Sequence, residues 1–472
     1  MAAGIPYGGC LTLHAGFEQF REGESFMQPH ASSVFGSLWL KLFVVMVVLI
    51  MFRAVPACAE DLETAYQQAV ATSPTIARAR AELDADLQTR PLARAALLPH
   101  LGANLSGGMN SARVTGFGSG PISTGYHSDL LSATLTQSIF DGQAWVSLKQ
   151  ADSRIRAGEE ALASAEQGLM LDVTQAYFQA LQAQANERVA RRQVKLLQTI
   201  ADQAGASLRI GTGDIISEQE AQAQLDTAKT DLIVAKNQVE VSKAQLQRLT
   251  HHRPGLLEDV KVLHVVGPRP DSLSPWLESA LKNQPLLEQA KATLETSKEQ
   301  VEFEKRARWP TLTLNGFVEH AAGTLIPPLA LNQTGAVLNV SIPFFEGGAI
   351  RARVRQAEAL SRASGDKVVA LKDQIGLDTQ AAFLTLQNSV ARFDAARKSV
   401  SSARISMEGT RKGYEIGSRS IIDLLTTTTG YAAAERNYYL ALYAHLVARI
   451  QLKAAAGVLT SKDIESLNTL LH

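Results

Sequence analysis

The chain has 472 residues, of which 46% are hydrophobic and only 6% aromatic, a composition that disfavours a bulky globular core. Lysine plus arginine and aspartate plus glutamate balance at 46 each, so the charge gives no reason to expect nucleic-acid binding. Both cysteines, Cys10 and Cys58, lie in the N-terminal segment, and removal of that segment would leave no thiol for a disulfide or a metal.

The N-terminal segment, residues 1–59, is typical of a secretory signal. Its apolar run at residues 38–52 is shorter than a transmembrane helix. A small-x-small pattern ends at Ala59 and predicts cleavage before Glu60. Met27 is an alternative start that would give a signal of ordinary length. A lipoprotein signal with Cys58 lipidated is a second interpretation, which the adjacent proline pattern disfavours.

An internal repeat organises the rest of the chain. Two proline pairs, Pro74 with Pro285 and Pro99 with Pro310, share one offset of 211 residues (285 − 74 and 310 − 99). Two further landmarks recur in the same order, namely Phe140-Asp141-Gly142 with Phe345-Glu346-Gly347 and Arg209-Ile210-Gly211 with Glu415-Ile416-Gly417. The sequence therefore predicts a first repeat at 60–266, a second at 267–459 and a C-terminal tail at 460–472.

Each repeat is predicted to begin with a helix, at 62–95 and 273–308, which a proline ends. Two strands of about ten residues follow, joined by loops at 111–125 and 321–335. Apolar residues alternate with polar ones along all four strands, for example Leu101, Ala103 and Leu105 against Gly102, Asn104 and Ser106.

This pattern is typical of outer-membrane barrel strands, although a soluble sheet gives a similar signal. Four strands are too few to close a barrel, because the smallest have about eight. Open sheet edges are not tolerated in lipid, so the protein is predicted to oligomerise. Aromatic residues at the helix-side strand ends fit an interfacial girdle or the packing of the strand-to-helix junction; they are Phe140, Trp309, Phe344 and Phe345.

A long helix follows the strands in each repeat, at 142–210 and 348–412. The first would extend about 100 Å at roughly 1.5 Å per residue, so it must lie against other long helices. Glycines break each long helix, and a second helix follows at 217–249 and at 421–459. Each repeat is therefore a long antiparallel helical hairpin with its turn far from the strands.

At this point the residues resemble the TolC family of outer-membrane channel proteins, from Glu60 to Leu459. The most specific stretch is 413–425, read Gly-Tyr-Glu-Ile-Gly-Ser-Arg-Ser-Ile-Ile-Asp-Leu-Leu. The resemblance implies an α+β membrane protein: a homotrimer with a twelve-stranded β-barrel in outer-membrane lipid, continued by an α-helical barrel in the periplasm of a Gram-negative bacterium. It also implies a periplasmic adaptor protein and an inner-membrane ABC or proton-driven pump as partners.

The resemblance further implies a gate at the helical turns, and by motif position Tyr414, Arg419 and Asp423 match gate residues. Three symmetric copies of an aspartate would form an acidic ring, a common device for cation selectivity. Two positions depart from the family pattern, because Thr426 and Ser217 stand where acidic residues are expected.

Glu218 and Asp214 are nearby acids that belong to the same predicted site. The competing interpretation of all these residues is an ordinary solvated helix end.

The sequence contains no phosphate loop, zinc-binding spacing or nucleophile elbow, so we expect no enzyme, cofactor or metal. The basic cluster Arg188, Arg191, Arg192 and Lys195 is read as a solvated or interhelical face. The leading function is a passive exit channel for efflux or type I secretion. The alternative is a non-transporting coiled-coil scaffold in the periplasm, which does not explain the strands.

Overall fold

The computed structural model describes residues 60–115, 122–260, 265–323 and 330–471. The chain divides into two units, Met1–Cys58 and Ala59–His472. The predicted signal segment, the alternative start at Met27 and the candidate lipidation site at Cys58 lie outside the described residues.

The helical segment before each pair of strands is broken where a single helix was predicted. In the first repeat it forms α2 (Leu62–Thr72), α3 (Pro74–Leu87) and α4 (Thr89–Ala95). In the second it forms α7 (Leu273–Asn283) and α8 (Pro285–Arg306). Pro74 and Pro285 cause the breaks before α3 and α8, because proline lacks the N–H that would continue the preceding helix but suits the first position of a new one.

The strands form one antiparallel sheet in the order β1-β2-β3-β4. Their bounds are β1 (His100–Val114), β2 (Ile122–Phe140), β3 (Thr311–Ala322) and β4 (Leu331–Ser341). The first-repeat strands have 15 and 19 residues, so the prediction of about ten was wrong there. The Gly- and Ser-rich stretch read as a loop instead continues the β1–β2 ladder as far as the pair Val114 and Ile122.

The predicted alternation along the strands is confirmed by the register. Leu101 faces Leu135, and Leu314 faces Leu338. Because Leu135 also faces Gly316, two residues from Leu314, apolar residues of all four strands share one side of the sheet. A bulge between Ser138 and Phe140 breaks the β2–β3 register. The extra residue turns Phe140 to the apolar side, where it pairs with Leu312.

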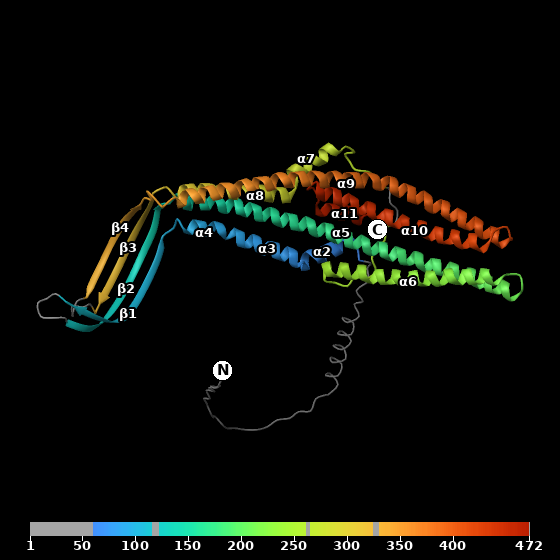
Figure 1. Cartoon of the computed structure of the whole chain (residues 1–472), viewed down its shortest axis with the longest axis horizontal. Helices are drawn as coiled ribbons and strands as arrows, with labels where there is room; N and C mark the ends of the chain where they lie inside the picture. Colours follow the sequence, from blue (N-terminus) through green and yellow to red (C-terminus); the bar gives the residue numbers. More distant parts are fainter. Residues whose placement is uncertain (1–59, 116–121, 261–264, 324–329, 472) are drawn as a thin grey trace, which may run out of the picture. The chain divides into compact units, whose positions relative to one another are not determined.

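Two long helical hairpins follow the strands. The first joins α5 (Gly142–Arg209) to α6 (Ile215–Thr250), and the second joins α9 (Ala349–Glu415) to α10 (Ile421–Ala455). Within the unit Ala59–His472, the sheet adjoins the start of α5 and α9, and both helical turns lie at the other end of the hairpins (Figure 1). Helix α5 also packs against α8 and α10. Among the described helices, none combines the length and the hydrophobicity of a membrane-spanning helix.

The largest buried cluster lies midway along the hairpins. Tyr177, Phe178 and Tyr443 form its aromatic centre, and all three are at most 1% exposed. The tail after residue 459 also belongs to it, because α11 (Ser461–Asn468) buries Ile464 and Leu467 there. The side-chain amide of Asn468 donates to Asp61 at 2.7 Å and so ties this helix to the start of α2.

Candidate gate at the helical turns

Two short turns close the hairpins, and their backbone hydrogen bonds match position by position. In the first turn, the amides of Thr212 and Gly213 both donate to the carbonyl of Ser207 at 3.0 Å. The equivalent bonds of the second turn run from the amides of Ser418 and Arg419 to the carbonyl of Gly413, at 2.8 and 3.2 Å. The central glycine of each turn has a φ of 77°, which residues with a side chain rarely adopt.

The side chains on this shared backbone are exchanged at one close contact. A Cβ placed on Gly213 would lie 3.0 Å from the Cβ of Ser207. A Cβ placed on Gly413 would lie 2.6 Å from the Cγ of Arg419. Each turn therefore has room for one side chain at this contact, and only the second turn places it on the turn itself. Arg419 fits because position 413 is glycine.

A second exchange occurs at the helix caps. Asp214 caps α6, and its carboxylate accepts hydrogen bonds from the amide and the hydroxyl of Ser217 at 2.9 and 2.7 Å. Ser420 caps α10, and its hydroxyl accepts from the amide of Asp423 at 3.1 Å. The carboxylate of Asp423 accepts in return from the amide of Ser420 at 3.2 Å, which completes a capping box. The carboxylate and the hydroxyl thus change places between the two turns.

These contacts hold both carboxylates in their charged form. The amide and hydroxyl of Ser217 lower the pKa of Asp214 below its usual value. Hydrogen bonds with Ser420 lower the pKa of Asp423, and the positive charge of Arg419 adds to the effect. Both turns therefore present negative charge at neutral pH, at N-termini whose helix dipoles favour it.

One groove brings three of the predicted residues together. Ser217, Tyr414 and Arg419 line it, together with Asp214 and Ser420. The ring of Tyr414 packs against an apolar cluster that both hairpins share, which includes Leu197, Leu225 and Leu424. The groove thus joins the end of the first hairpin to the end of the second.

The other three predicted residues lie outside that groove lining. Asp423 is engaged in the cap of its own helix. Thr426 is exposed, and its carbonyl accepts from the hydroxyl of Thr429 at 2.9 Å. Glu218 lies against α5, where its carboxylate oxygen is 3.3 Å from the Cβ position of Gly205.

Polar links between the hairpins lie further along the helices. The guanidinium of Arg192 on α5 donates to both carboxylate oxygens of Glu435 on α10, at 3.1 Å each. Tyr431 donates to the same carboxylate at 2.9 Å. Arg188 pairs with Asp259 at 2.5 Å, and Asp259 also accepts from Tyr443 at 2.6 Å. The basic cluster of α5 is thus partly interhelical, and the sequence pattern showed the arginines without their partners.

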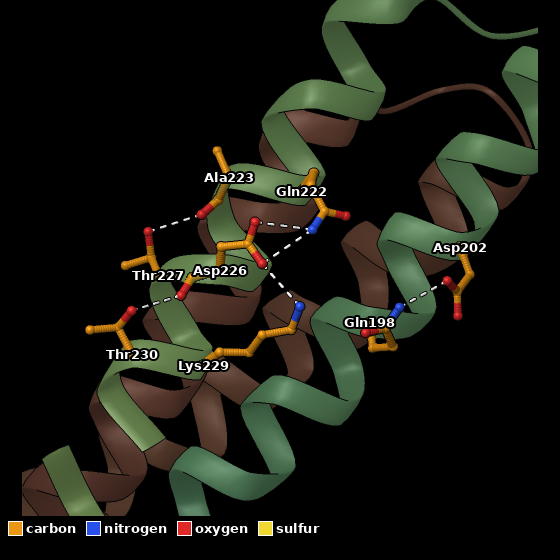
Figure 2. Close-up of polar contacts among 8 residues, drawn as sticks. All are labelled: Gln198, Asp202, Gln222, Ala223, Asp226, Thr227, Lys229 and Thr230. Atoms are coloured by element: carbon orange, nitrogen blue, oxygen red, sulfur yellow. Dashed lines mark hydrogen bonds and ion pairs between the residues drawn. The ribbon is translucent and has the colours of Figure 1, made fainter. Parts of the chain in front are cut away.

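The outer part of the first hairpin carries polar contacts that stay within one helix (Figure 2). Asp226 accepts from Lys229 at 2.9 Å and from Gln222 at 3.1 Å. On α5, Gln198 donates to Asp202 at 2.9 Å. Across the residues placed by the structure, no group of three or more His, Cys, Asp or Glu side chains is arranged to hold a metal ion.

Comparison with known proteins identifies the family. A family model described as outer membrane efflux protein matches residues 65–251 and 276–458. The chain belongs to this family. The Outer membrane protein TolC of Escherichia coli (strain K12) is 26% identical over 427 residues, which cover 88% of this chain and 85% of that protein. The Alkaline protease secretion protein AprF of Pseudomonas aeruginosa is 27% identical and covers 87% of both chains.

Solved structures of outer-membrane channels share the fold of this outer membrane efflux protein. The Campylobacter jejuni CmeC channel matches with a TM-score of 0.77 at 16% identity, over 88% of this chain and 90% of that one. The open state of the Neisseria gonorrhoeae MtrE channel matches with a TM-score of 0.69 at 18% identity, over 84% and 89%. These relatives are channel and secretion proteins, and this efflux protein localises to the outer membrane.

Proposed function

We propose that this protein is the exit channel of a tripartite efflux or type I secretion system, gated at the ends of its helical hairpins. The sheet carries this proposal. Apolar residues cover one of its sides, and Leu101, Leu105 and Met109 are 77–93% exposed there. Within the described sheet, β1 and β4 each pair on one side only. Lipid suits the apolar side but does not tolerate the open edges.

Assembly of three copies resolves this conflict. Three four-stranded sheets joined edge to edge give a closed barrel of twelve strands, large enough for a transmembrane pore. The helical hairpins then continue the barrel into the periplasm as an α-helical tunnel. The resemblance to trimeric channels supports this number of copies.

The two helical turns form the gate in this proposal. In a trimer, three copies of Asp423 make an acidic ring that favours cations. Arg419 lines the groove between the two turns, and in this proposal it binds carboxylates of a neighbouring turn, a pairing that suits a guanidinium. Asp214 supplies the first-turn carboxylate that Ser217 lacks, three residues earlier in the chain.

The channel itself is passive in this proposal, and energy comes from an inner-membrane ABC or proton-driven pump joined through a periplasmic adaptor. The names of the relatives support both kinds of cargo. One is an alkaline protease secretion protein, and another is the Toxin and drug export protein A of Aggregatibacter actinomycetemcomitans. Substrate choice is assigned to the pump.

Single-channel conductance in a planar bilayer tests the gate. Asp423→Asn removes the charge but keeps an oxygen that accepts from the Ser420 amide, so the helix cap is retained. We expect small cation-selective openings for the wild type and weaker cation selectivity for the variant. Asp202→Asn, at an exposed aspartate of α5, serves as the matched control and leaves selectivity unchanged.

Each outcome decides between named alternatives. Pores that are indifferent to Asp423→Asn would keep the channel and move the gate to Asp214 or Glu218. An absence of openings from folded, trimeric protein would favour the periplasmic scaffold. Recovery of the protein in the soluble periplasmic fraction, instead of the outer membrane, would contradict the channel itself.

A further inference from the structure

The two aromatic-acid-glycine segments that precede the long helices differ sharply in burial. In the first repeat, Phe140 is 39% exposed and stacks on Trp309 with ring centroids 6.1 Å apart. In the second, Phe345 is 87% exposed and its neighbour Phe344 is 90% exposed. The aromatic residue of this motif therefore packs against another side chain in the first repeat and is exposed to solvent in the second.

The following glycines show the same difference. A Cβ placed on Gly142 would lie 3.3 Å from Cε3 of Trp309 and 3.4 Å from the Cβ of Arg306. The same position on Gly347 meets no heavy atom of the described residues within 4 Å. The first segment is thus pressed against the end of α8, and the second faces open space.

The packing partner of Phe140 is determined by the order of the strands in the sheet. Phe140 ends β2, and Trp309 precedes β3, the strand that pairs with β2. An aromatic residue after one strand thus packs on the residue before the next strand. Phe345 follows β4, and β4 is an edge strand of the described sheet, so no next strand of the same copy supplies its packing partner.

The offset of 211 residues between the repeats identifies the expected packing partner of Phe345. Trp309 corresponds to Leu98 (309 − 211), which precedes β1, the strand at the other edge of the sheet. Leu98 is 47% exposed and Trp145 is 55% exposed, although both are large apolar residues. They line a groove at the junction of α4 and α5 whose other lining residues are Arg90, Pro91, Arg94, Leu97 and Leu148.

We infer that Phe345 of one copy docks in this groove of the next copy, beside Leu98 and Trp145. The inference rests on the proposed ring of copies, because pairing of β4 with the next β1 brings the segment after β4 beside the segment before β1. The contact reproduces between copies the one that Phe140 makes with Trp309 within a copy. A burial of this kind is a hydrophobic contribution to assembly located outside the lipid-facing strands.

The helices that follow extend the same interface. Helix α5 packs against α8, the last helix of the other repeat before its strands. In the repeat, α9 corresponds to α5, and α3 with α4 corresponds to α8. The inference therefore packs α9 against α3 and α4 of the next copy. Both partners carry unpaired apolar side chains for this contact: Leu360 and Val369 on α9 are 60% and 58% exposed, and Leu87 and Leu92 on α3 and α4 are 41% and 70% exposed.

Chemical crosslinking tests the contact in outer membranes, where only folded and inserted protein is counted. The variant Phe345→Cys/Leu98→Cys is treated with a short bis-maleimide, and we expect crosslinked dimers and trimers on a denaturing gel. Each single-cysteine variant serves as control and should remain monomeric, because the predicted cleavage before Glu60 removes Cys10 and Cys58 from the exported protein. Phe345→Cys/Trp145→Cys is a second pair that uses the opposite wall of the groove.

A strand pair separates this inference from the proposed ring. In the β2–β3 register Leu135 faces Gly316, so the repeat places Val340 (135 + 205) opposite Leu105 (316 − 211) of the next copy. Crosslinking through Val340→Cys/Leu105→Cys, with none through the two pairs that contain Phe345→Cys, would overturn the docking contact and keep the proposed ring of copies. No crosslinking through any of the three pairs would overturn the ring and the docking contact together.

Discussion

The two helical turns share one backbone but exchange the side chains that stabilise it. In the first turn, Ser207 faces Gly213, whereas in the second Gly413 faces Arg419. Each exchange keeps the local requirement, which is one side chain at a close contact and one carboxylate–hydroxyl pair at a helix cap. It changes only the outward chemistry, since the second turn gains an arginine.

The capping of each helix can therefore be separated from the position of the negative charge on its turn. The cap of α6 pairs Asp214 with Ser217, and the cap of α10 pairs Ser420 with Asp423. Either order satisfies the backbone amides. The order therefore decides where on each turn the negative charge lies.

The close contact is expected to be the most sensitive feature. Gly413→Ser adds a side chain where Arg419 already lies, and overpacking at this contact should destabilise the turn. The double variant Gly413→Ser/Arg419→Gly recreates the arrangement of Ser207 and Gly213 and should regain most of that loss. Hydrogen–deuterium exchange of the second turn measures both effects. Strictly additive losses in the double variant would show that the two residues do not share the contact.

The caps are expected to contribute less than the close contact, because both cap residues are exposed and water can replace part of each hydrogen bond. Asp214→Ala should increase amide exchange at the start of α6, and Ser420→Ala should do so at the start of α10. Asp423→Ala leaves Ser420 as the cap of α10 and should have the smaller effect of the two changes there. An equal or larger effect would mean that the aspartate, and not the serine, anchors the turn.

Acid should loosen both turns over the same range of pH. The folded-state pKa values of Asp214 and Asp423 are lowered, so their contribution is present above the ordinary aspartate pKa of about 3.9 and is lost as the pH falls below it. We expect amide exchange at the two turns, corrected for its intrinsic pH dependence, to rise together below about pH 4. Asp214→Asn should remove this pH dependence from the first turn only. A turn that loosens near neutral pH would point to a different titrating group.

The periodicity of apolar residues and the positions of proline and glycine predicted most of the fold. The long helices, the alternating strands and the two turns were correctly located because helix formers, period-two stretches and glycines carry their signal locally. The break at Pro74 was missed because the apolar pattern continues across it, although Ser73 can cap a new helix and Pro74 can begin one. The full length of β1 and β2 was missed because glycine and serine are typical of loops, whereas here a long paired ladder accommodates them.

The candidate site was predictable in position more than in contacts. The motif around Tyr414 and Arg419 located the second turn, and the missing acid at Ser217 was visible as a departure. The partner of Ser217, Asp214, was harder to predict. An aspartate three residues earlier resembles any turn residue in sequence, and its role is clear only from the hydrogen bond that the Ser217 hydroxyl donates to its carboxylate. The link between Arg192 and Glu435 joins positions 243 residues apart, which no local pattern connects.

The two ends of the described chain meet beside the segment that joins the repeats. The amide of Glu60 donates to the carbonyl of Leu256 at 2.7 Å, and α11 contacts α2 through Asn468 and Asp61. The order of the repeats along the chain is therefore not imposed by the fold. A circular permutant that joins Leu471 to Glu60 through a short linker and opens the chain at the exposed residues His251 and His252 is expected to fold with the second repeat first.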